Sequence, residues 1–416
     1  MKQLGVAVIG GGPAGLFCAI CSAAAGKKVA VLEKMPTCGR KLLISGTGQC
    51  NITHDGDVSS FFTHYGAHGK FVKPALLQFS NRNLVDFFRK SGLDMVTEPG
   101  GKVFPVTRRA GDILSVLTGE CTRRGVDIRC NEPVLGTEQC EGGFTVRTGE
   151  GVYFTRNLVV ATGGATYPAT GSTGDGYALA RSLGHPVTEI GPALAAVRVK
   201  DFPYPELAGM SFENLPISVS RQKRLVCRQR GDILFTHTGL SGPGILDISR
   251  DIRPADLVEV SFISTLAPAE ARNAVHDALL GGKGMHVATV LRGLNLPERL
   301  AKRIPEHAGV PAGATCAHLS KGARNAIAVL VSGHPFEVAG LAGFDQAMVT
   351  RGGVALDLVN PRTMESRLHP GLYFVGEVLD IDGDTGGYNL QFACASGVLA
   401  ARSITRTAMN QRTTMP

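Results

Sequence analysis

The sequence contains 416 residues, of which 44% are hydrophobic, and carries a formal net charge of +8. A chain of this length exceeds what one hydrophobic core usually serves, so we expect two or three domains. It has no apolar run long enough to cross a bilayer, and its first residues lack the cleavage site of a signal peptide. These features argue against a membrane protein and predict a cytoplasmic one.

The ten cysteines lack the paired spacing of zinc sites, so we predict free thiols and no metal site. Cys18 and Cys21 form the one Cys-x-x-Cys pair, but they lie in a predicted helix, where small cysteines usually fill a core. The densest basic run, residues 221–230, alternates with apolar residues, which is typical of the solvated face of strands. We therefore expect a small-molecule substrate as partner, not nucleic acid and not a membrane.

The chain opens with the pattern of a strand, a glycine turn and a helix. An apolar run over residues 4–9 leads into Gly10-Gly11-Gly12-Pro13-Ala14-Gly15, and an alanine-rich helix is predicted over residues 14–25. This context separates a dinucleotide-binding turn from an isolated glycine-rich motif. The free N–H groups at the start of such a helix favour the phosphates of a ligand.

The glycines of this motif have distinct expected roles. Gly10 allows the tight turn, Gly12 lets a pyrophosphate approach the backbone, and Gly15 lets the helix pack closely on the strand. A second strand, predicted over residues 28–32, ends at Glu33, whose carboxylate can accept hydrogen bonds from an adenosine ribose. The segment therefore predicts dinucleotide binding.

The next segments continue an α/β pattern. Residues 39–53 are rich in glycine and small hydroxyls, and we expect a loop there that runs beside the bound cofactor. Apolar spacing predicts helices over residues 76–91 and 111–124. The strands predicted next are 126–130, a hairpin of 143–147 and 152–154, and the continuous apolar run 158–161.

The pattern of predicted secondary structure changes at about residue 195. Short antiparallel strands are predicted over residues 195–199, 217–220, 225–228 and 257–263, followed by a helical region over 268–330 and strands again over 336–356. The chain then ends with a strand over 372–375, a helix over 390–404 and a loose tail from Arg406. This order predicts a nucleotide domain that is split in sequence by an inserted unit of residues 193–356.

Four motifs stand together in this chain: the glycine turn with Glu33, Gly39–Thr53, Ala161–Gly164 with Gly171–Tyr177, and Gly376–Gln391. Together they resemble the two-dinucleotide-binding-domain flavoproteins. More narrowly, the sequence resembles the BaiN/RdsA family of NAD(P)/FAD-dependent oxidoreductases, also described as YhiN-type or aminoacetone-oxidase-type flavoproteins. It departs from the usual pattern of that family at Gln49, where Arg is common, and at Asp384, where Tyr is common. We expect both positions to lie near the flavin.

The resemblance implies FAD as the cofactor and a Rossmann-like α/β domain formed by residues 1–192 and 357–416. It also implies an inserted β-barrel-like domain of residues 193–267 and 331–356, which itself contains a small helical domain of residues 268–330. Members of the family have been linked to oxidation of an amino ketone and to reduction of steroid-like enones. The implied activity is hydride transfer at flavin N5 to or from a small organic substrate.

The resemblance also suggests where each part of FAD would bind. The pyrophosphate belongs at the glycine turn and the ribityl chain at Glu377. The adenine belongs near the backbone of Val134, which we expect in a short proline-containing loop after a strand. The start of the last helix would favour negative charge on the reduced flavin. Arg40 and Lys41 either neutralise phosphate or pack along the adenine, with an ordinary surface pair as the alternative. The expected cofactor-binding residues are Gly10, Gly12, Pro13, Ala14, Gly15, Glu33, Lys34, Gly39, Arg40, Lys41, Ser45, Gly46, Asn51, Val134, Ala161, Thr162, Gly163, Gly376, Glu377, Gly386, Gly387, Tyr388, Asn389 and Leu390.

The sequence does not single out a catalytic residue. The candidates for moving a proton are Cys50, Asn51, Tyr167, His237 and Tyr388. A second strand–glycine turn–helix unit is absent from the sequence, so we expect NAD(P)H to bind transiently over the flavin, unless an organic substrate reduces it. Two other function classes stay open: a flavoprotein that binds or modifies RNA, and a flavin-binding protein without turnover.

Overall fold

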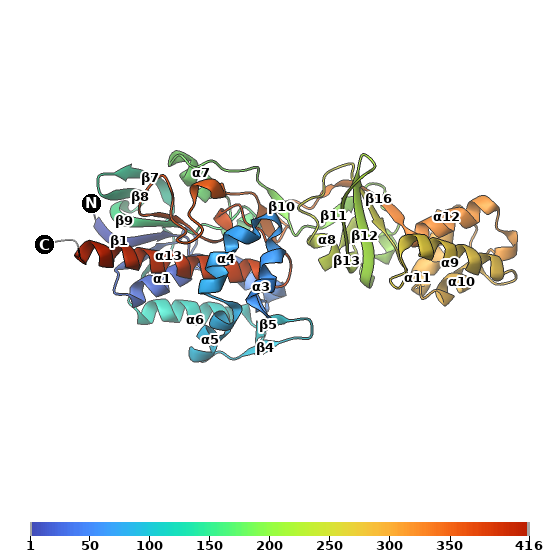
Figure 1. The fold of residues 1–416 in the computed structure, drawn as a ribbon, viewed down its shortest axis with the longest axis horizontal. Helices are drawn as coiled ribbons and strands as arrows, with labels where there is room; N and C mark the ends of the chain where they lie inside the picture. The colour runs from blue at the N-terminus through green and yellow to red at the C-terminus, as the bar shows by residue number, and fades with distance from the viewer. Residues whose placement is uncertain (1, 414–416) are drawn as a thin grey trace. The chain divides into compact units, whose positions relative to one another are not determined.

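The computed structural model describes residues 2–413, with side chains as far as Arg406. The chain divides into two compact units, Met1–Pro192 with Phe344–Pro416, and Ala193–Gly343. The first unit is therefore discontinuous in sequence (Figure 1). Within the described part of the chain, no helix is both long and apolar enough to cross a membrane.

A parallel sheet organises the first unit. β1 (Lys2–Ile9) pairs in parallel with β2 (Val29–Leu32) on one side and with β9 (Gly151–Val160) on the other. β18 (Leu372–Phe374) comes from the C-terminal segment and pairs in parallel with β9, so it completes the sheet. The C-terminal residues of β1 and β9 are buried, as expected for strand segments with both faces covered. The predicted Rossmann-type α/β domain is confirmed.

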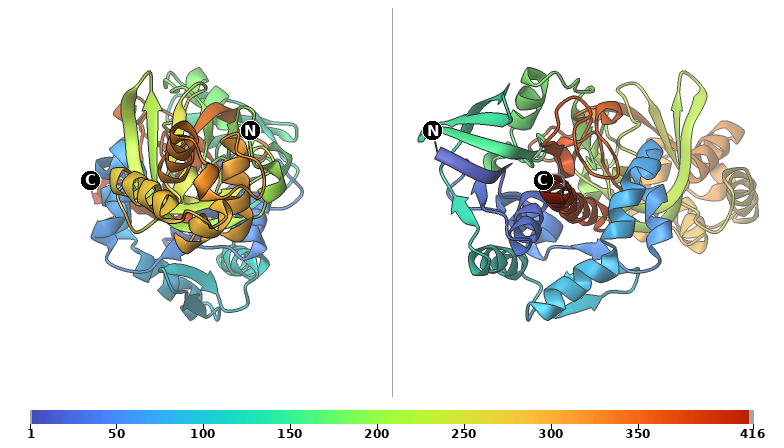
Figure 2. Two further views of the ribbon diagram at one scale, coloured as in Figure 1. Left: turned by 90° about the vertical axis from the view of Figure 1, so that its right-hand side faces the viewer. Right: turned by 60° about the vertical axis from the view of Figure 1, so that its left-hand side comes forward.

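Helices and further strands surround these four strands. β6 (Asp127–Arg129) pairs with β2, and the antiparallel strands β7 (Val134–Cys140) and β8 (Gly143–Thr148) extend the sheet beyond β9. α1 (Pro13–Ala24) packs against both α13 (Tyr388–Thr413) and α6 (Ala110–Arg123), and Figure 2 shows α13 running beside α1. The remaining elements of this unit include α3 (Val58–Phe61), α7 (Asp175–Ser182), and the small sheet of β3 (Thr53–His54), β4 (Met95–Thr97) and β5 (Lys102–Pro105).

The expected loop over residues 39–53 is partly helical. It contains α2 (Arg40–Ile44), followed by a 3-10 turn (Ser45–Gly48). Gly46 and Thr47 adopt left-handed backbone conformations inside that turn. The segment therefore places Arg40 and Lys41 on a short helix and not on a loop.

The helix predicted over residues 76–91 is two helices, α4 (Gly69–Gln78) and α5 (Asn81–Lys90). They separate at Ser80, which caps α5. The Ser80 hydroxyl accepts a hydrogen bond from the Asn83 N–H, and the Asn83 side chain accepts one from the Ser80 N–H. This reciprocal capping box starts a second helix. The apolar spacing across Ser80 therefore does not correspond to one continuous helix.

Two further predictions in the first unit are wrong. Val134 begins β7 and does not lie in a short loop. The loose tail expected from Arg406 is helical as far as Thr413, because α13 continues through a stretch without glycine or proline. The last part of that expected tail, residues 414–416, lies outside the described residues.

The second unit contains a closed barrel of antiparallel strands and a group of helices. The barrel closes because β16 pairs with both β15 and β11. Its strands, in order around the barrel, are β11 (Val197–Val199), β14 (Gly239–Ser241), β13 (Arg224–Phe235), β12 (Ser211–Arg221), β15 (Leu257–Val260) and β16 (His334–Leu341). The helices are α8 (Pro243–Leu246), α9 (Pro268–Gly281), α10 (Val287–Gly293), α11 (Glu298–His307) and α12 (Lys321–Ser332).

The observed units differ from the expected domains in two respects. The helices of residues 268–330 share one hydrophobic core with the barrel, so both belong to one unit. Residues 344–356 belong to the first unit and not to the barrel. The reason is that β17 (Val349–Arg351) pairs with β10 (Gly191–Ala193), and the Thr350 N–H donates a hydrogen bond to Glu377.

The cysteines are all free, as predicted. Burial raises the pKa of Cys18 to about 12 and that of Cys21 to about 11. Both thiols therefore stay protonated at neutral pH, which agrees with a packing role in α1. The described residues contain no group of three His, Cys, Asp or Glu side chains that could hold a metal ion.

Candidate functional site

Several of the residues predicted to bind the cofactor follow the ends of four strands in the first unit. β1 leads into Gly10, β2 into Glu33, β9 into Ala161 and β18 towards Gly376. Because these strands are parallel, their carboxyl ends lie at one edge of the sheet. This is the edge at which doubly wound sheets bind ligands.

The glycine turn has the geometry that its motif predicts. Gly10 has a φ of +107°, and a Cβ there would lie 2.5 Å from the carbonyl oxygen of Ala161. A Cβ at Gly15 would lie 2.1 Å from the carbonyl oxygen of Gly10, so helix and strand approach each other closely. A Cβ at Gly12 would meet no heavy atom within 4 Å. The turn is therefore tight on its inner side and open at the position expected for the pyrophosphate.

The start of α1 is also suited to an anion. Gly12 caps the helix without a side-chain hydrogen bond, and the first turn contains no acidic residue. The first N–H groups of the helix consequently remain available, and the helix dipole favours a negative group beside them.

Glu33 links the end of β2 to the glycine turn. Its Oε2 accepts a hydrogen bond from the Gly11 N–H at 2.8 Å, and its Oε1 accepts one from the Met35 N–H at 2.8 Å. These bonds fix the carboxylate beside the turn, while each oxygen retains a lone pair for a ribose hydroxyl.

Lys34 connects this region to another predicted motif. Its Nζ contacts Asp175, the first residue of α7, and the Thr173 hydroxyl. Burial raises the pKa of Asp175, but the hydrogen bonds from Lys34 and Thr173 outweigh it and hold that pKa below its usual value. Lys34 therefore connects the Gly171–Tyr177 motif to the segment that follows β2 and contains Glu33.

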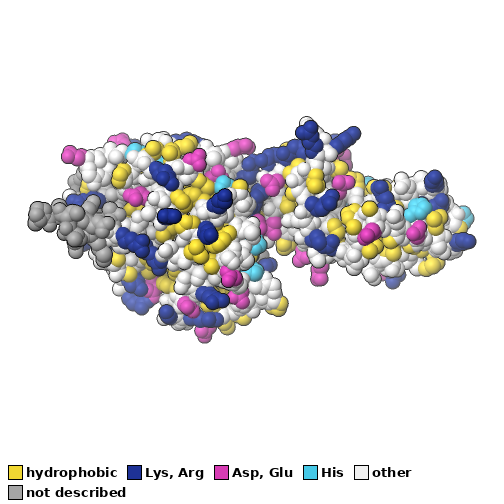
Figure 3. All heavy atoms as spheres, viewed as in Figure 1, with side chains coloured by type: hydrophobic (Ala, Val, Ile, Leu, Met, Phe, Trp, Pro, Cys, Tyr) yellow, Lys and Arg dark blue, Asp and Glu magenta, His cyan; other side chains and the backbone are white. Residues whose placement is uncertain are grey.

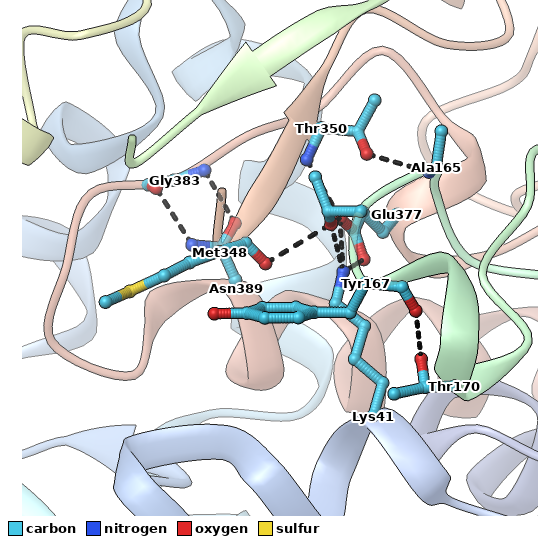
Figure 4. A network of polar contacts seen from close by, with 10 residues as sticks. Lys41, Ala165, Tyr167, Thr170, Met348, Thr350, Glu377, Gly383 and Asn389 are labelled. Atoms are coloured by element: carbon cyan, nitrogen blue, oxygen red, sulfur yellow. Dashed lines mark hydrogen bonds and ion pairs between the residues drawn. The ribbon is translucent and has the colours of Figure 1, made fainter. Parts of the chain in front are cut away.

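Glu377 is the centre of a polar network (Figure 4). The Lys41 Nζ lies 2.9 and 2.8 Å from its two carboxylate oxygens and donates to the Thr166 hydroxyl at 2.6 Å. The Thr350 N–H donates to Glu377 Oε1 at 2.9 Å, and the Thr350 hydroxyl accepts from the Ala165 N–H. Lys41 is thus bound to the acid expected to hold the ribityl chain, and it is not an ordinary surface cation.

Among the described residues, the enclosed polar atoms without a hydrogen-bond partner include two at predicted cofactor-binding positions. They are the Arg40 Nε and the Thr162 hydroxyl, which follows β9. Buried donors are almost always paired in folded proteins, so the Arg40 Nε is suited to donate to a bound ligand. Asn51, in contrast, is engaged, because its side-chain oxygen accepts from the Val103 N–H.

The loop before α13 is held by its own residues. The Asn389 side chain accepts from the Gly383 N–H and donates to the Gly383 carbonyl, both at 2.8 Å. A Cβ at Gly387 would lie 2.6 Å from the Thr53 backbone, which requires glycine there. Tyr388 and Leu390 follow in the first turn of α13. The start of α13 is therefore closely packed, and the loop before it is held by hydrogen bonds.

Tyr388 is stacked between two histidine rings. The His64 ring lies 4.0 Å from the Tyr388 ring with an angle of 12° between the planes, and the His54 ring lies 5.4 Å away at 13°. The Tyr65 hydroxyl donates to the Tyr388 carbonyl at 2.8 Å. Burial and the neighbouring Tyr388 and Asp384 raise the pKa of Tyr65 well above its usual value, so this phenol remains a donor.

The pair of His64 and Asp384 was missed by sequence reasoning. The Nδ1 of His64 lies 3.0 Å from an Asp384 carboxylate oxygen, and the Asp384 N–H donates to the His64 carbonyl at 2.9 Å. The two residues are 320 positions apart, and no local pattern connects them. The departure from the family pattern at Asp384 was the one available signal.

The catalytic candidates have different surroundings. Cys50 is fully buried, and burial raises its pKa to about 12, which excludes a thiolate at neutral pH. Tyr167 lies beside the Glu377 network, and its hydroxyl is 3.4 Å from the Gln346 carbonyl. Tyr388 starts α13, whereas His237 lies in an exposed turn of the second unit. Tyr167 and Tyr388 therefore belong to the unit that contains the predicted cofactor site, and His237 belongs to the second unit.

These features fit a bound FAD. The open Gly12 and the start of α1 would receive the pyrophosphate, and the Glu33 carboxylate would accept from the ribose. The unpartnered Arg40 Nε would donate to an anionic or carbonyl oxygen. All of the predicted cofactor residues lie in the first unit.

Comparison with known proteins gives the same family over nearly the whole chain. A family model described as the HI0933-like protein Rossmann domain matches residues 4–403. The 3-dehydro-bile acid delta(4,6)-reductase of Clostridium scindens is 30% identical over 411 residues, which cover 97% of this chain and 99% of that protein. A ribosomal RNA dihydrouridine synthase of Haemophilus influenzae is 32% identical over 409 residues, which cover 96% of this chain and 98% of that protein.

Among solved structures, the fold is similar to that of 3-ketosteroid delta1-dehydrogenase from Sterolibacterium denitrificans, with a TM-score of 0.52. The two chains are 14% identical, and the match covers 98% of this chain and 100% of that one, so the likeness concerns the fold. Since the family model and the relatives span nearly the entire sequence, the chain belongs to the HI0933-like family of Rossmann-type flavoproteins and is an FAD-dependent oxidoreductase.

Proposed function

We propose that this chain transfers hydride between flavin N5 and a small organic substrate, with NAD(P)H as a transient electron donor. The observation that carries the proposal is the glycine turn, which is open at Gly12 and lies beside the fixed Glu33 carboxylate. Bound FAD would supply the hydride chemistry, and the protein would bind and orient it. The start of α13 would favour negative charge on the pyrimidine edge of the flavin.

We further propose that the substrate carries a carbon–carbon double bond conjugated to a carbonyl group. The names of the two relatives support this, because a delta(4,6)-reductase and a dihydrouridine synthase both saturate such a bond. Hydride addition to the carbon remote from the carbonyl leaves negative charge on the oxygen and the adjacent carbon. A proton donor is therefore required in the same site.

The first test is anaerobic mixing of the flavin-loaded protein with NADH and, separately, with NADPH, followed by the visible flavin absorbance. Rapid bleaching by one nucleotide supports a reductase. The reduced protein is then mixed with a 3-keto-Δ4,6 steroid, and return of the absorbance supports the proposed substrate class. If dithionite bleaches the flavin but neither nucleotide does, the NAD(P)H part of the proposal is wrong.

A second candidate is reduction of a base in RNA. Lys and Arg side chains gather over the turn end of the β12–β13 hairpin (Figure 3). Lys223, Arg224 and Arg228 are exposed there, and none of the three has an ion pair with a described residue. This free positive charge, together with a relative named as a ribosomal RNA dihydrouridine synthase, favours the candidate.

The test of this second candidate is retention of a uridine-containing RNA by the purified protein at increasing salt. Binding through the hairpin predicts retention that weakens steeply with salt and is reduced in Arg224→Gln/Arg228→Gln. A flat salt response with an unchanged double variant excludes this binding surface.

A further inference from the structure

The proposed reduction needs a proton donor, and the histidines beside Tyr388 differ in their ability to supply it. Both ring nitrogens of His54 face carbonyl oxygens, with Nδ1 2.7 Å from Asp55 O and Nε2 2.8 Å from Gly100 O. Both ring nitrogens of His54 are therefore already in contact with backbone carbonyl oxygens. His64 uses its Nδ1 for Asp384 and has no hydrogen bond at Nε2 with a described residue.

The His64 ring is fixed in place by two contacts. Its Nδ1 lies 3.0 Å from the Asp384 carboxylate, and its face stacks on Tyr388 at 4.0 Å. Among the described residues, the ionisable groups in contact with the ring include Asp384, from the loop before α13, and Tyr388, from α13 itself. Because the two ring nitrogens point to different sides of the imidazole, Nε2 points away from Asp384. The His64 side chain is 34% exposed, so the protein does not enclose the ring completely.

The position of the pair places it at the start of α13, where the flavin ring is expected. Tyr388 is the first residue of that helix, and Asp384 belongs to the loop clamped by Asn389. A carboxylate that accepts from one nitrogen of a histidine fixes the ring orientation and leaves the other nitrogen to exchange a proton. The geometry therefore combines an oriented imidazole, a free ring nitrogen and proximity to the helix start.

We propose that His64 is the proton donor of the reaction and that Asp384 is its positioning residue. This inference rests on the proposed function. The hydride adds to the carbon remote from the carbonyl and brings both electrons, while the Nε2–H bond of protonated His64 breaks as a C–H bond forms at the carbon next to the carbonyl. His64 becomes neutral and regains its proton from water. NAD(P)H is the reductant that supplies the two electrons for the next turnover.

The test separates proton delivery from flavin reduction. Holoprotein is reduced anaerobically with a stoichiometric amount of dithionite and mixed with a 3-keto-Δ4,6 steroid, and the return of flavin absorbance is timed. His64→Gln is expected to slow this step at least about 100-fold, the usual contribution of a general acid, while flavin content and dithionite reduction are unchanged. Asp384→Asn is expected to slow it about tenfold or more. Added imidazole should restore part of the rate in His64→Ala.

His68→Gln is the matched control, since His68 ends the same short helix (Phe62–His68) and makes no polar contact with a described residue. A second readout does not depend on activity: nitrogen-15 NMR of labelled histidine should show the proton of neutral His64 on Nδ1, and a changed tautomer balance in Asp384→Asn. An unchanged rate in His64→Gln, or a proton on Nε2 of neutral His64, overturns the inference alone. Failure of the wild-type protein to be reoxidised by the steroid overturns the proposed substrate class and the inference together.

Discussion

Gly12 and Gly15 lie three residues apart in one turn but meet opposite constraints. A Cβ at Gly12 would contact nothing within 4 Å, whereas a Cβ at Gly15 would collide with the Gly10 carbonyl oxygen. The first glycine leaves room for a ligand, and the second leaves room for the protein itself. We therefore expect Gly12 to be needed for ligand binding and Gly15 to be needed for the stability of the fold.

Gly12→Ala should therefore leave the thermal unfolding of the apoprotein unchanged but weaken FAD retention. Gly15→Ala should lower the stability of the apoprotein, because the clashing atom belongs to the backbone and cannot turn aside. Thermal unfolding without FAD and flavin content after gel filtration measure the two effects. Full flavin retention by Gly12→Ala would contradict the assigned position of the pyrophosphate.

The Lys41–Glu377 pair makes a second prediction at this scale. Lys41→Met removes a cation from both oxygens of a carboxylate that is only 20% exposed. We expect the free energy of unfolding to fall by about 1–3 kcal/mol, as for other half-buried polar groups left without a partner. Urea unfolding of the apoprotein measures it.

Lys41→Met/Glu377→Gln is the control for this pair. The double variant should lose less stability than the sum of the two single variants, because each single change already breaks the same contact. Strict additivity would show that the pair does not stabilise the fold.

At the scale of elements, the break between α4 and α5 shows how a local polar signal overrides apolar periodicity. The hydrophobic residues on either side of Ser80 share helical spacing, but the capping box of Ser80 and Asn83 starts a new helix. The end of α13 also depends on local sequence: the helix continues to Thr413 because its last turns contain no glycine or proline.

Ser80→Ala should lower the free energy of unfolding by about 1 kcal/mol, because the first turn of α5 loses its cap. Ser115→Ala provides the comparison: Ser115 is exposed in the interior of α6, where alanine is the better helix former. The denaturant midpoints of both variants measure the difference. Equal midpoints would mean that the capping box contributes nothing to stability.

At the scale of the whole molecule, the two units have separate hydrophobic cores. We therefore expect their unfolding to respond differently to acid and to FAD. The candidate FAD residues lie in the first unit. The second unit contains His334, whose Nε2 accepts a hydrogen bond from the Tyr204 hydroxyl at 2.7 Å and whose ring is buried. Burial, with a smaller effect of His307, lowers the pKa of His334 to about 3.

This pKa predicts acid sensitivity of the second unit. Below the ordinary histidine pKa of about 6.5, the unfolded chain binds a proton at His334 that the folded unit does not. Stability is therefore lost as the pH falls from about 6.5 towards 3, by at most about 1.4 kcal/mol per pH unit. Calorimetry at pH 7 and 5, with and without FAD, measures it: acid should lower the transition of the second unit, and FAD should raise that of the first.

His334→Gln keeps an acceptor for the Tyr204 hydroxyl but cannot titrate, so its unfolding should depend less on pH in this window. The same loss of stability on acidification in wild type and variant would contradict the assignment to His334.

Much of the first unit could be predicted from sequence because its signals are local. The turn at Gly10–Gly15 and the acid at Glu33 follow directly from strand ends that the apolar pattern reveals. The closed barrel is also present, as the family resemblance implies. The extent of the units was harder to predict. Residues 344–356 have a strand-like pattern but belong to the first unit, where β17 pairs with β10.

The sequence by itself determined the local geometry of the cofactor motifs, because a tight turn, a helix start and the acid after a strand depend on a few neighbouring residues. Only the tertiary structure decided which distant side chains meet. Lys41 and Glu377 are 336 positions apart, and His64 and Asp384 are 320 apart. Such pairs form when sheet and helices pack, and their contact depends on the position of every intervening element, which no local pattern encodes.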